Sequence, residues 1–294
     1  MTHTHDGIDW PSRLAAFRRI DELQEPVMRT VAERLIELTP ARATVADIGP
    51  GAGGMSTALA MAMGKRGGGT VVLVDAVPEL LSASAEQVRR AVTSLPEQVD
   101  VRAIRVDAAS DELTSLLSDV DLVWASRVVH HLPDQQDGIN RLTRLLAPGG
   151  WLAISEGGLG TRCLPWDLGV GEPGLGDRLE AAGAAWFADM RSGMPGSVRL
   201  PVGWTQALAD AGLVGVSSFS YLIDLPAPPS ERVRQSVVDW LSWVAGVAAE
   251  RLGEADQAAL VRLLDPDDPA FVGARDDVFI LTASTIHLGR KISG

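Results

Sequence analysis

The most constraining feature of the chain is segment 45–56, which reads Val-Ala-Asp-Ile-Gly-Pro-Gly-Ala-Gly-Gly-Met-Ser. Its apolar first half favours a buried strand. Gly49, Gly51 and Gly53 can adopt positive φ angles and let a ligand approach the bare backbone. The helix that follows should point its unpaired N–H groups and its positive dipole end into the turn. The segment therefore predicts a strand–turn–helix unit that holds a small, nucleotide-like ligand.

Strand and helix signals alternate from residue 27 to about residue 156, as a parallel α/β sheet requires. The expected strands are 44–48, 70–75, 99–106, 121–125, 151–155, 216–224 and 278–288. The expected helices are 12–23, 27–38, 55–63, 79–95, 113–117, 138–146, 175–190, 204–211 and 230–264. Segment 157–173 is rich in Gly and Pro and is expected to be a loop. The predicted fold class is α/β, a doubly wound, mostly parallel sheet of seven strands with helical insertions.

Charge and composition limit the classes of molecule that the protein is expected to bind. The net charge is −12, which argues against a nucleic-acid partner because such proteins usually present a basic face. The sequence shows neither a signal peptide nor an apolar run of about 18 residues, so we expect a cytoplasmic protein without a membrane partner. The single cysteine, Cys163, allows no intrachain disulfide and no zinc cluster, and no metal site is predicted. A structural thiol is favoured over a nucleophile at Cys163.

The glycine pattern fits two ligand classes. Gly49, Gly51 and Gly54 match the dinucleotide pattern G-x-G-x-x-G, whereas Asp47, with the glycines that follow it, matches D-x-G-x-G-x-G. A carboxylate at Asp47 would repel a pyrophosphate, but it would attract the ammonium and sulfonium of S-adenosylmethionine. A tight turn without any ligand is the remaining alternative.

Two further acids follow the next strands. Asp75 ends the second strand, where a carboxylate can accept hydrogen bonds from ribose hydroxyls. Asp107 and Ala108 follow the third strand, where a carboxylate can accept from an adenine amine and a backbone N–H can donate to the ring. Each acid has an alternative role as the cap of the helix that follows it.

These motifs resemble the class I S-adenosylmethionine-dependent methyltransferases across residues 30–156. The resemblance rests on 47–53, Asp75, Asp107, 121–134 and 146–151 in that order. It implies a Rossmann-like methyltransferase fold, S-adenosylmethionine as cofactor and S-adenosylhomocysteine as product. The residues that it implies for the methionine end, the ribose, the adenine and the methyl group are Asp47, Gly49, Gly51, Gly53, Asp75, Ala76, Asp107, Ala108, Ser126 and Arg127.

The segment after the fourth strand ends in His-His-Leu-Pro-Asp and lacks an Asn-Pro-Pro-Tyr signature, so it looks like the small-molecule branch of that family. The expected acceptor carries an O, N or C nucleophile. His130 and His131 are the candidate bases, because a histidine titrates near neutral pH. Glu156 is a weaker candidate for a base or an acceptor anchor. Methyl transfer can also be driven by positioning alone, so a loop-ordering role for the histidines stays open.

We expect a single domain over residues 1–294. Its core would comprise 30–156, 204–225 and 271–290, and its lid 1–29, 157–203 and 226–270. Tryptophans in the lid favour an aromatic or heteroaromatic acceptor. The abundance of Ala, Arg, Leu and Gly resembles a bacterial tailoring enzyme of secondary metabolism. A homodimer is left open.

Two other functions remain at this point. An NAD(P)-dependent oxidoreductase would use the same glycine-rich turn. A catalytically silent protein would bind S-adenosylmethionine without turning it over.

Overall fold

The computed structural model describes residues 7–95 and 97–292. The parts of the expected domain and lid at residues 1–6, 96 and 293–294 lie outside these ranges. The chain divides into two compact units, the first comprising 1–157, 194–220 and 285–294, the second 158–193 and 221–284.

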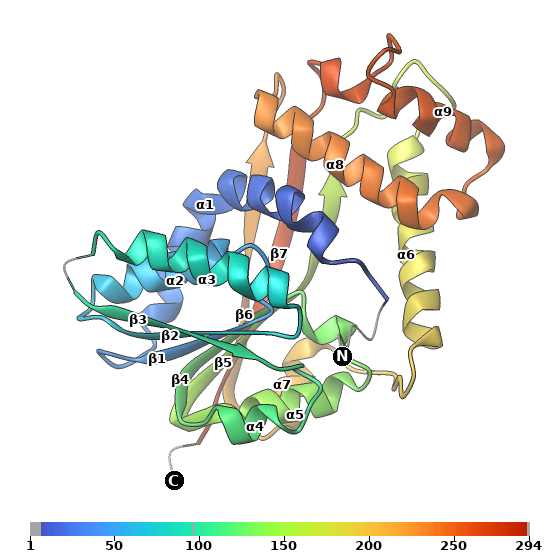
Figure 1. Ribbon diagram of the computed structural model, residues 1–294. Helices are drawn as coiled ribbons and strands as arrows, with labels where there is room; N and C mark the ends of the chain where they lie inside the picture. The colour runs from blue at the N-terminus through green and yellow to red at the C-terminus, as the bar shows by residue number, and fades with distance from the viewer. Residues whose placement is uncertain (1–6, 96, 293–294) are drawn as a thin grey trace. The chain divides into compact units, whose positions relative to one another are not determined.

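A seven-stranded sheet has the order β3-β2-β1-β4-β5-β7-β6 (Figure 1). The strands are β1 (Thr44–Ile48), β2 (Gly69–Asp75), β3 (Val99–Arg105), β4 (Val120–Ser126), β5 (Leu146–Arg162), β6 (Val214–Leu225) and β7 (Ile280–Arg290). The pairs β1–β2, β1–β4, β2–β3 and β4–β5 are parallel. Strand β7 runs antiparallel to β5, since Gly149 N donates to Lys291 O at 3.1 Å and Lys291 N donates to Gly150 O at 2.9 Å. The predicted fold class is confirmed.

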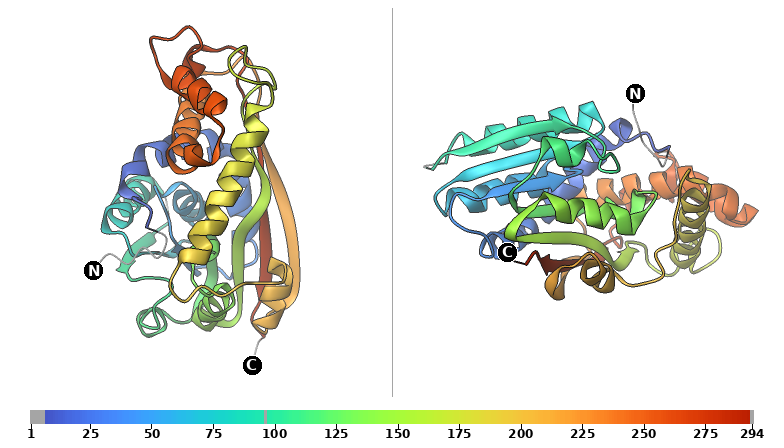
Figure 2. Two further views of the ribbon diagram at one scale, coloured as in Figure 1. Left: turned by 90° about the vertical axis from the view of Figure 1, so that its right-hand side faces the viewer. Right: turned by 90° about the horizontal axis from the view of Figure 1, so that it is seen from below.

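Helices cover both faces of the sheet in the first unit. The helices of the first unit are α1 (Leu14–Ile36), α2 (Gly54–Gly64), α3 (Pro78–Val92), α4 (Leu113–Leu116), α5 (Gln135–Leu145) and α7 (Trp204–Asp210). Those of the second unit are α6 (Leu175–Gly193), α8 (Glu231–Ala248) and α9 (Glu254–Leu264). Figure 2 shows α1, α2 and α3 on one face and α4 and α5 on the other, which is the doubly wound arrangement. Within the described ranges, every helix is too short or too polar to cross a bilayer.

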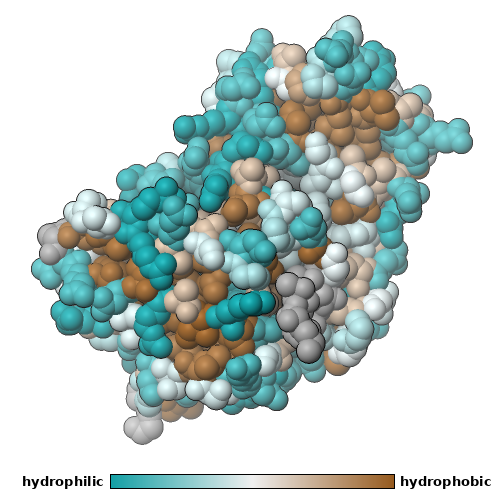
Figure 3. Space-filling view, viewed as in Figure 1, coloured by the Kyte–Doolittle hydropathy of each residue, from teal (hydrophilic) through white to brown (hydrophobic). Residues whose placement is uncertain are grey.

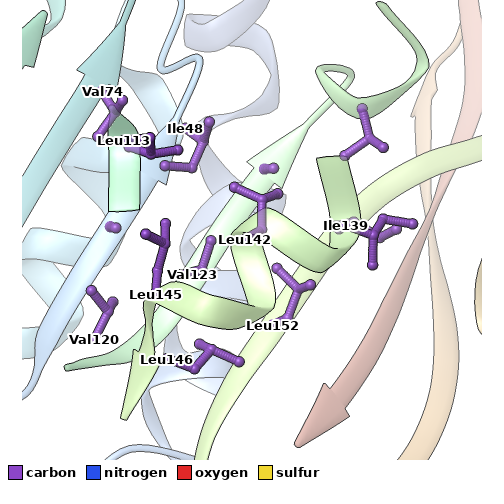
Figure 4. Packing of buried hydrophobic residues seen from close by; sticks show 14 of the residues in the cluster. Ile48, Val74, Leu113, Val120, Val123, Ile139, Leu142, Leu145, Leu146 and Leu152 are labelled. Atoms are coloured by element: carbon purple, nitrogen blue, oxygen red, sulfur yellow. The ribbon is translucent and has the colours of Figure 1, made fainter. Parts of the chain in front are cut away.

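One hydrophobic core lies between β1, β2, β4, β5 and helices α4, α5 and α7 (Figure 4). Leu142 and Leu145 on α5 are fully buried and lie among Ile48, Val123 and Leu152 from three neighbouring strands. The strands can be apolar along both faces because helices cover each one. This core fixes the strand ends at which the candidate site forms.

The second unit is organised by α6, α8 and α9. Trp186 on α6 meets Trp243 on α8 edge to face, with ring centroids 5.7 Å apart. Arg178 on α6 donates to both carboxylate oxygens of Asp256 on α9, at 2.7 and 2.8 Å. Figure 3 shows apolar surface in the region of α9, where Val261 is largely exposed.

Three expected boundaries are wrong. The separate helices 12–23 and 27–38 form one helix, α1, with Pro26 inside it. Proline removes one backbone donor, and Pro26 is exposed, so the loss of that bond does not end the helix. Part of the expected loop 157–173 is strand, because β5 continues to Arg162. The expected helix 230–264 is divided into α8 and α9, and Gly253 caps the second of them.

Two leucines in helices on the same face of the sheet should differ in how much their replacement destabilises the fold. Leu142→Ala should lower the free energy of unfolding by about 2–5 kcal/mol, because it leaves a cavity in a fully buried cluster. Leu116→Ala, at a side chain that is 42% exposed on α4, should cost less than about 1 kcal/mol. Urea unfolding followed by circular dichroism measures both, and equal losses would contradict this placement of the core.

Candidate functional site

The glycine-rich turn follows β1 with the predicted backbone conformation. Gly49, Gly51 and Gly53 have φ angles of +68°, +57° and +96°. A Cβ at Gly49 would lie 2.5 Å from Val128 Cγ2, and one at Gly53 would lie 2.9 Å from Ser84 Cα. At Gly51, no atom of the described residues lies within 4 Å of the corresponding position. Packing thus requires glycine at the first and third positions, while Gly51 borders open space that a ligand can enter.

The N-terminus of α2 differs from the sequence expectation. Gly54 N donates to Asp21 Oδ2 at 2.9 Å, so the amide that was expected to be unpaired is bound by a carboxyl group from α1. The local pattern gave no signal for this contact, because the two residues are 33 positions apart in the chain. Asp21 therefore belongs to the candidate site, although sequence reasoning did not name it.

Two carboxyl groups lie at the turn, that of Asp47 buried and that of Asp21 half-buried. Burial raises the pKa of Asp21 to about 7, the hydrogen bond from Gly54 lowers it, and Glu22 raises it further. Burial also raises the pKa of Asp47 to about 7, against the hydrogen bond from Ser56 and with added repulsion from Asp21 and Asp75. These carboxyl groups lie in a region where negative charge is poorly solvated, so a cation binding there would be favoured.

Asp75 is the last residue of β2, and Asp107 lies two residues after the end of β3. Asp75 Oδ1 accepts from Val77 N at 2.8 Å, and burial raises the pKa of Asp75 to about 6. Asp107 Oδ1 accepts from Ala109 N, also at 2.8 Å. Because β1, β2 and β3 are parallel neighbours, their carboxyl ends share one edge of the sheet. The sheet thus brings Asp47, Asp75 and Asp107 to one edge, with Ala76 and Ala108 directly after the last two.

At the end of β4 the chain turns sharply. Ser126 is the last residue of β4, and Arg127 has a φ angle of +54°. Arg127 N donates to Ser155 O on β5 at 3.0 Å. Val128 then packs against Gly49, so this turn abuts the glycine-rich turn. A positive φ at a residue other than glycine is unusual and is often found at functional sites.

Glu156, at the end of the first-unit part of β5, organises the histidine turn, which we define as Val128–His131. Glu156 is 3% exposed, and its Oε1 accepts from Val128 N at 3.1 Å and Val129 N at 2.9 Å. Its Oε2 lies 2.5 Å from His130 Nδ1. A carboxylate at Nδ1 favours the tautomer with hydrogen on Nδ1, which puts the basic lone pair on Nε2. The structure thus brings two of the three candidate catalytic residues into direct contact.

The third candidate, His131, faces the N-terminal segment. Its ring lies 5.2 Å from the Trp10 ring, edge to face, and 4.2 Å from the ring of His130. Trp10 in turn stacks on Phe17 of α1 at 6.1 Å. The segment leading into α1 therefore contacts the histidine turn, while Asp21 on the same helix contacts the glycine-rich turn.

Cys163 lies in the second unit and is buried. Burial raises the pKa of its thiol far above the ordinary value, so the thiolate is strongly disfavoured. A nucleophilic role needs the thiolate, and the structure therefore supports a structural role for this residue.

Comparisons with known proteins agree with this geometry. Residues 46–152 match a family model described as a methyltransferase domain. The 27-O-demethylrifamycin SV methyltransferase of Amycolatopsis mediterranei is 32% identical over 137 residues, which cover 46% of each chain. The bifunctional biotin biosynthesis protein BioCD of Bordetella avium is 33% identical over 133 residues, which cover 45% of this chain and 26% of that protein. The chain thus spans less than half the length of these curated relatives.

A solved structure supports the fold independently. A protein of Bacillus halodurans described as a methyltransferase has a TM-score of 0.50 and 14% identity, covering 89% of this chain and 98% of that one. At this identity the likeness concerns the fold, which is Rossmann-like. Residues 46–152 thus match a methyltransferase domain, the motifs predicted from the sequence lie in order within that range, and the solved structure shares the Rossmann-like fold.

Proposed function

We propose that this chain transfers the methyl group of S-adenosylmethionine to a nucleophile on a small organic molecule. The observation that carries the proposal is the acidic character of the glycine-rich turn. Asp21 binds the first amide of α2, and Asp47 is buried beside it. The turn therefore offers negative charge where a phosphate-binding turn offers backbone donors.

This arrangement argues against the dinucleotide alternative. A dinucleotide places its pyrophosphate at the N-terminus of the helix after the first strand. Here the Gly54 amide is already bound by Asp21 at 2.9 Å. A pyrophosphate would have to displace the Asp21 carboxylate and approach that of Asp47. The lost hydrogen bond and the repulsion between like charges both oppose binding.

The residues present fit S-adenosylmethionine. Gly51 leaves the turn open to a ligand, and Asp47 would attract the positively charged methionine end. Asp75 would accept hydrogen bonds from the ribose, and Asp107 with the Ala108 amide would hold the adenine. Ser126 and Arg127, at the end of β4, would lie beside the methionine portion. When bound, this cofactor supplies an electrophilic methyl group on a sulfonium.

His130 is our candidate for the base. Glu156 holds His130 Nδ1, so Nε2 can accept the proton that an acceptor O–H or N–H loses as its nucleophile takes the methyl group. Glu156 receives backbone N–H groups as well as the histidine, so we assign it a positioning role. His131 would shape the same surface through its contact with Trp10. Exclusion of water and alignment of the acceptor would supply the rest of the rate enhancement.

The acceptor is proposed to be a small, aromatic or heteroaromatic natural product. One relative is named for 27-O-demethylrifamycin SV, and its matched half is 32% identical to this chain. The net charge of −12 disfavours a nucleic-acid acceptor. We infer a bacterial, cytoplasmic tailoring enzyme in which 1–29, 157–203 and 226–270 serve as the lid of a single methyltransferase domain.

A silent S-adenosylmethionine-binding protein is separated from an enzyme by turnover. Incubation with S-adenosylmethionine and a set of aromatic natural products, followed by mass spectrometry, should show an acceptor that gains one methyl group. Binding without any methylated product across that set would favour the silent protein.

Gly51→Ala should disrupt cofactor binding and spare the fold. Its new Cβ meets no described atom within 4 Å, but it enters the open side of the turn. Gly212→Ala is the matched control, because Gly212 also has a positive φ and no neighbour within 4 Å. Both variants should lose about 1–2 kcal/mol of stability. Only Gly51→Ala should weaken S-adenosylmethionine binding, by tenfold or more in calorimetry, and unchanged affinity would remove this turn from the cofactor site.

Stability without ligand should fall as pH rises. The raised pKa of Asp47, about 7, means that the native state holds a proton that the unfolded chain loses near pH 4. The stability from that proton is complete below pH 4 and lost by pH 7. Asp47→Asn keeps an acceptor for Ser56 but needs no proton. It should match the wild type at pH 4 and exceed it at pH 8 by about 1–4 kcal/mol in urea unfolding. A wild type that gains on the variant as pH rises would contradict the burial of this charge.

His130→Ala should lower kcat by about 10²–10⁴-fold on a methylated acceptor, with S-adenosylmethionine affinity unchanged. His131→Ala is the comparison, because the His131 ring lies in the same turn against the rings of Trp10 and His130. Its effect should be smaller and should fall mainly on KM. If both variants keep the wild-type kcat, positioning alone drives the transfer.

A further inference from the structure

Asp21 contacts the glycine-rich turn from outside the matched domain, which begins at residue 46. It lies on α1 and reaches the first residue of α2, where its Oδ2 accepts from Gly54 N. A Cβ at Gly54 would lie 2.4 Å from Asp21 Cγ, so the carboxyl group is packed directly against the backbone. The turn thus receives a charge that its own sequence does not encode.

From this contact we infer that Asp21 is a specificity-determining residue that makes the site prefer the charged methyl donor to its neutral product. The inference rests on the proposed function and deepens it. S-adenosylmethionine and S-adenosylhomocysteine differ by one methyl group and by the positive charge on sulfur. A residue that acts through charge must therefore affect the two ligands unequally.

The surroundings of Asp21 favour such an effect. Asp21 is half-buried, and loss of hydration raises its pKa to about 7, so its charged form is incompletely solvated. A nearby cation supplies that compensation and a neutral ligand does not. Asp47 repels Asp21, which adds to the gain when a positive charge enters.

The hydrogen bond to Gly54 fixes where the charge acts. Gly54 directly follows Gly53, the last glycine of the turn, and Gly51 borders the open space of the same turn. A ligand that enters beside Gly51 therefore approaches the same turn that Asp21 contacts at Gly54. A charge acts over several ångströms without direct contact, whereas a hydrogen bond requires contact.

The preference has a consequence for turnover. Transfer of the methyl group removes the positive charge from sulfur, and the attraction to Asp21 ends at the same moment. The product is then held less tightly than the donor, which favours its release. Asp21 would in this way limit inhibition by S-adenosylhomocysteine.

The test is the ratio of the two dissociation constants, measured by calorimetry at pH 8. Asp21→Asn keeps an oxygen that can accept from Gly54 N and removes the charge. We expect the ratio of the S-adenosylhomocysteine Kd to the S-adenosylmethionine Kd to fall about three- to tenfold in this variant. Asp21→Glu should retain much of the preference. Glu25→Gln is the matched control, because Glu25 lies one turn along α1 with an exposed side chain, and it should leave the ratio unchanged.

Each outcome is decisive. Retained S-adenosylhomocysteine binding in Asp21→Asn shows that the variant is folded, and a ratio within twofold of the wild type then overturns the inference. Equal weakening of both ligands also overturns it, because Asp21 would then act through shape. A wild type that binds neither ligand would instead refute the proposed function.

Discussion

The gathering of carboxyl groups at the glycine-rich turn, with Asp47 buried and the others half-buried, is the constraint on which the proposed function of this protein depends. Parallel pairing of β1 with β2, and of β2 with β3, places Asp47, Asp75 and Asp107 at one edge of the sheet. Asp21 then arrives from α1 and binds the helix end that would otherwise attract an anion. Negative charge in such a place is unfavourable without a partner. A cationic ligand would offset this cost, and the proposed cofactor, S-adenosylmethionine, would provide the charge.

The second constraint is the histidine turn. Glu156 gathers the backbone amides of Val128 and Val129 on one oxygen and His130 on the other. Because Val128 also packs against Gly49, the order of this turn is coupled to that of the glycine-rich turn. His287 Nε2 lies 3.1 Å from Glu156 O, which ties β7 to the same place. One buried carboxylate therefore positions the proposed base beside the proposed cofactor site.

The sequence predicted what is encoded locally. The strand, glycine turn and helix at 45–56 could be found because positive φ angles and apolar runs leave a local pattern, and the seven strands could be found in the same way. Asp21 could not be found, because its contact with Gly54 joins residues far apart in the chain. The contact between Glu156 and His130 is equally long-range, although both residues were candidates from their positions after strands. Pro26 favoured the end of a helix, but α1 continues through it. Gly157 and Gly158 favoured a loop, but β5 continues through them.

The most direct measurement is calorimetric titration of the wild type with S-adenosylmethionine near pH 7, in two buffers of different ionisation enthalpy. If a cation binds beside carboxyl groups whose pKa values are about 7, those values must fall, and protons must be released on binding. The account predicts saturable binding with net proton release, and no binding of NAD⁺ under the same conditions. Binding of NAD⁺ in place of S-adenosylmethionine, or binding of S-adenosylmethionine without proton release, would contradict it.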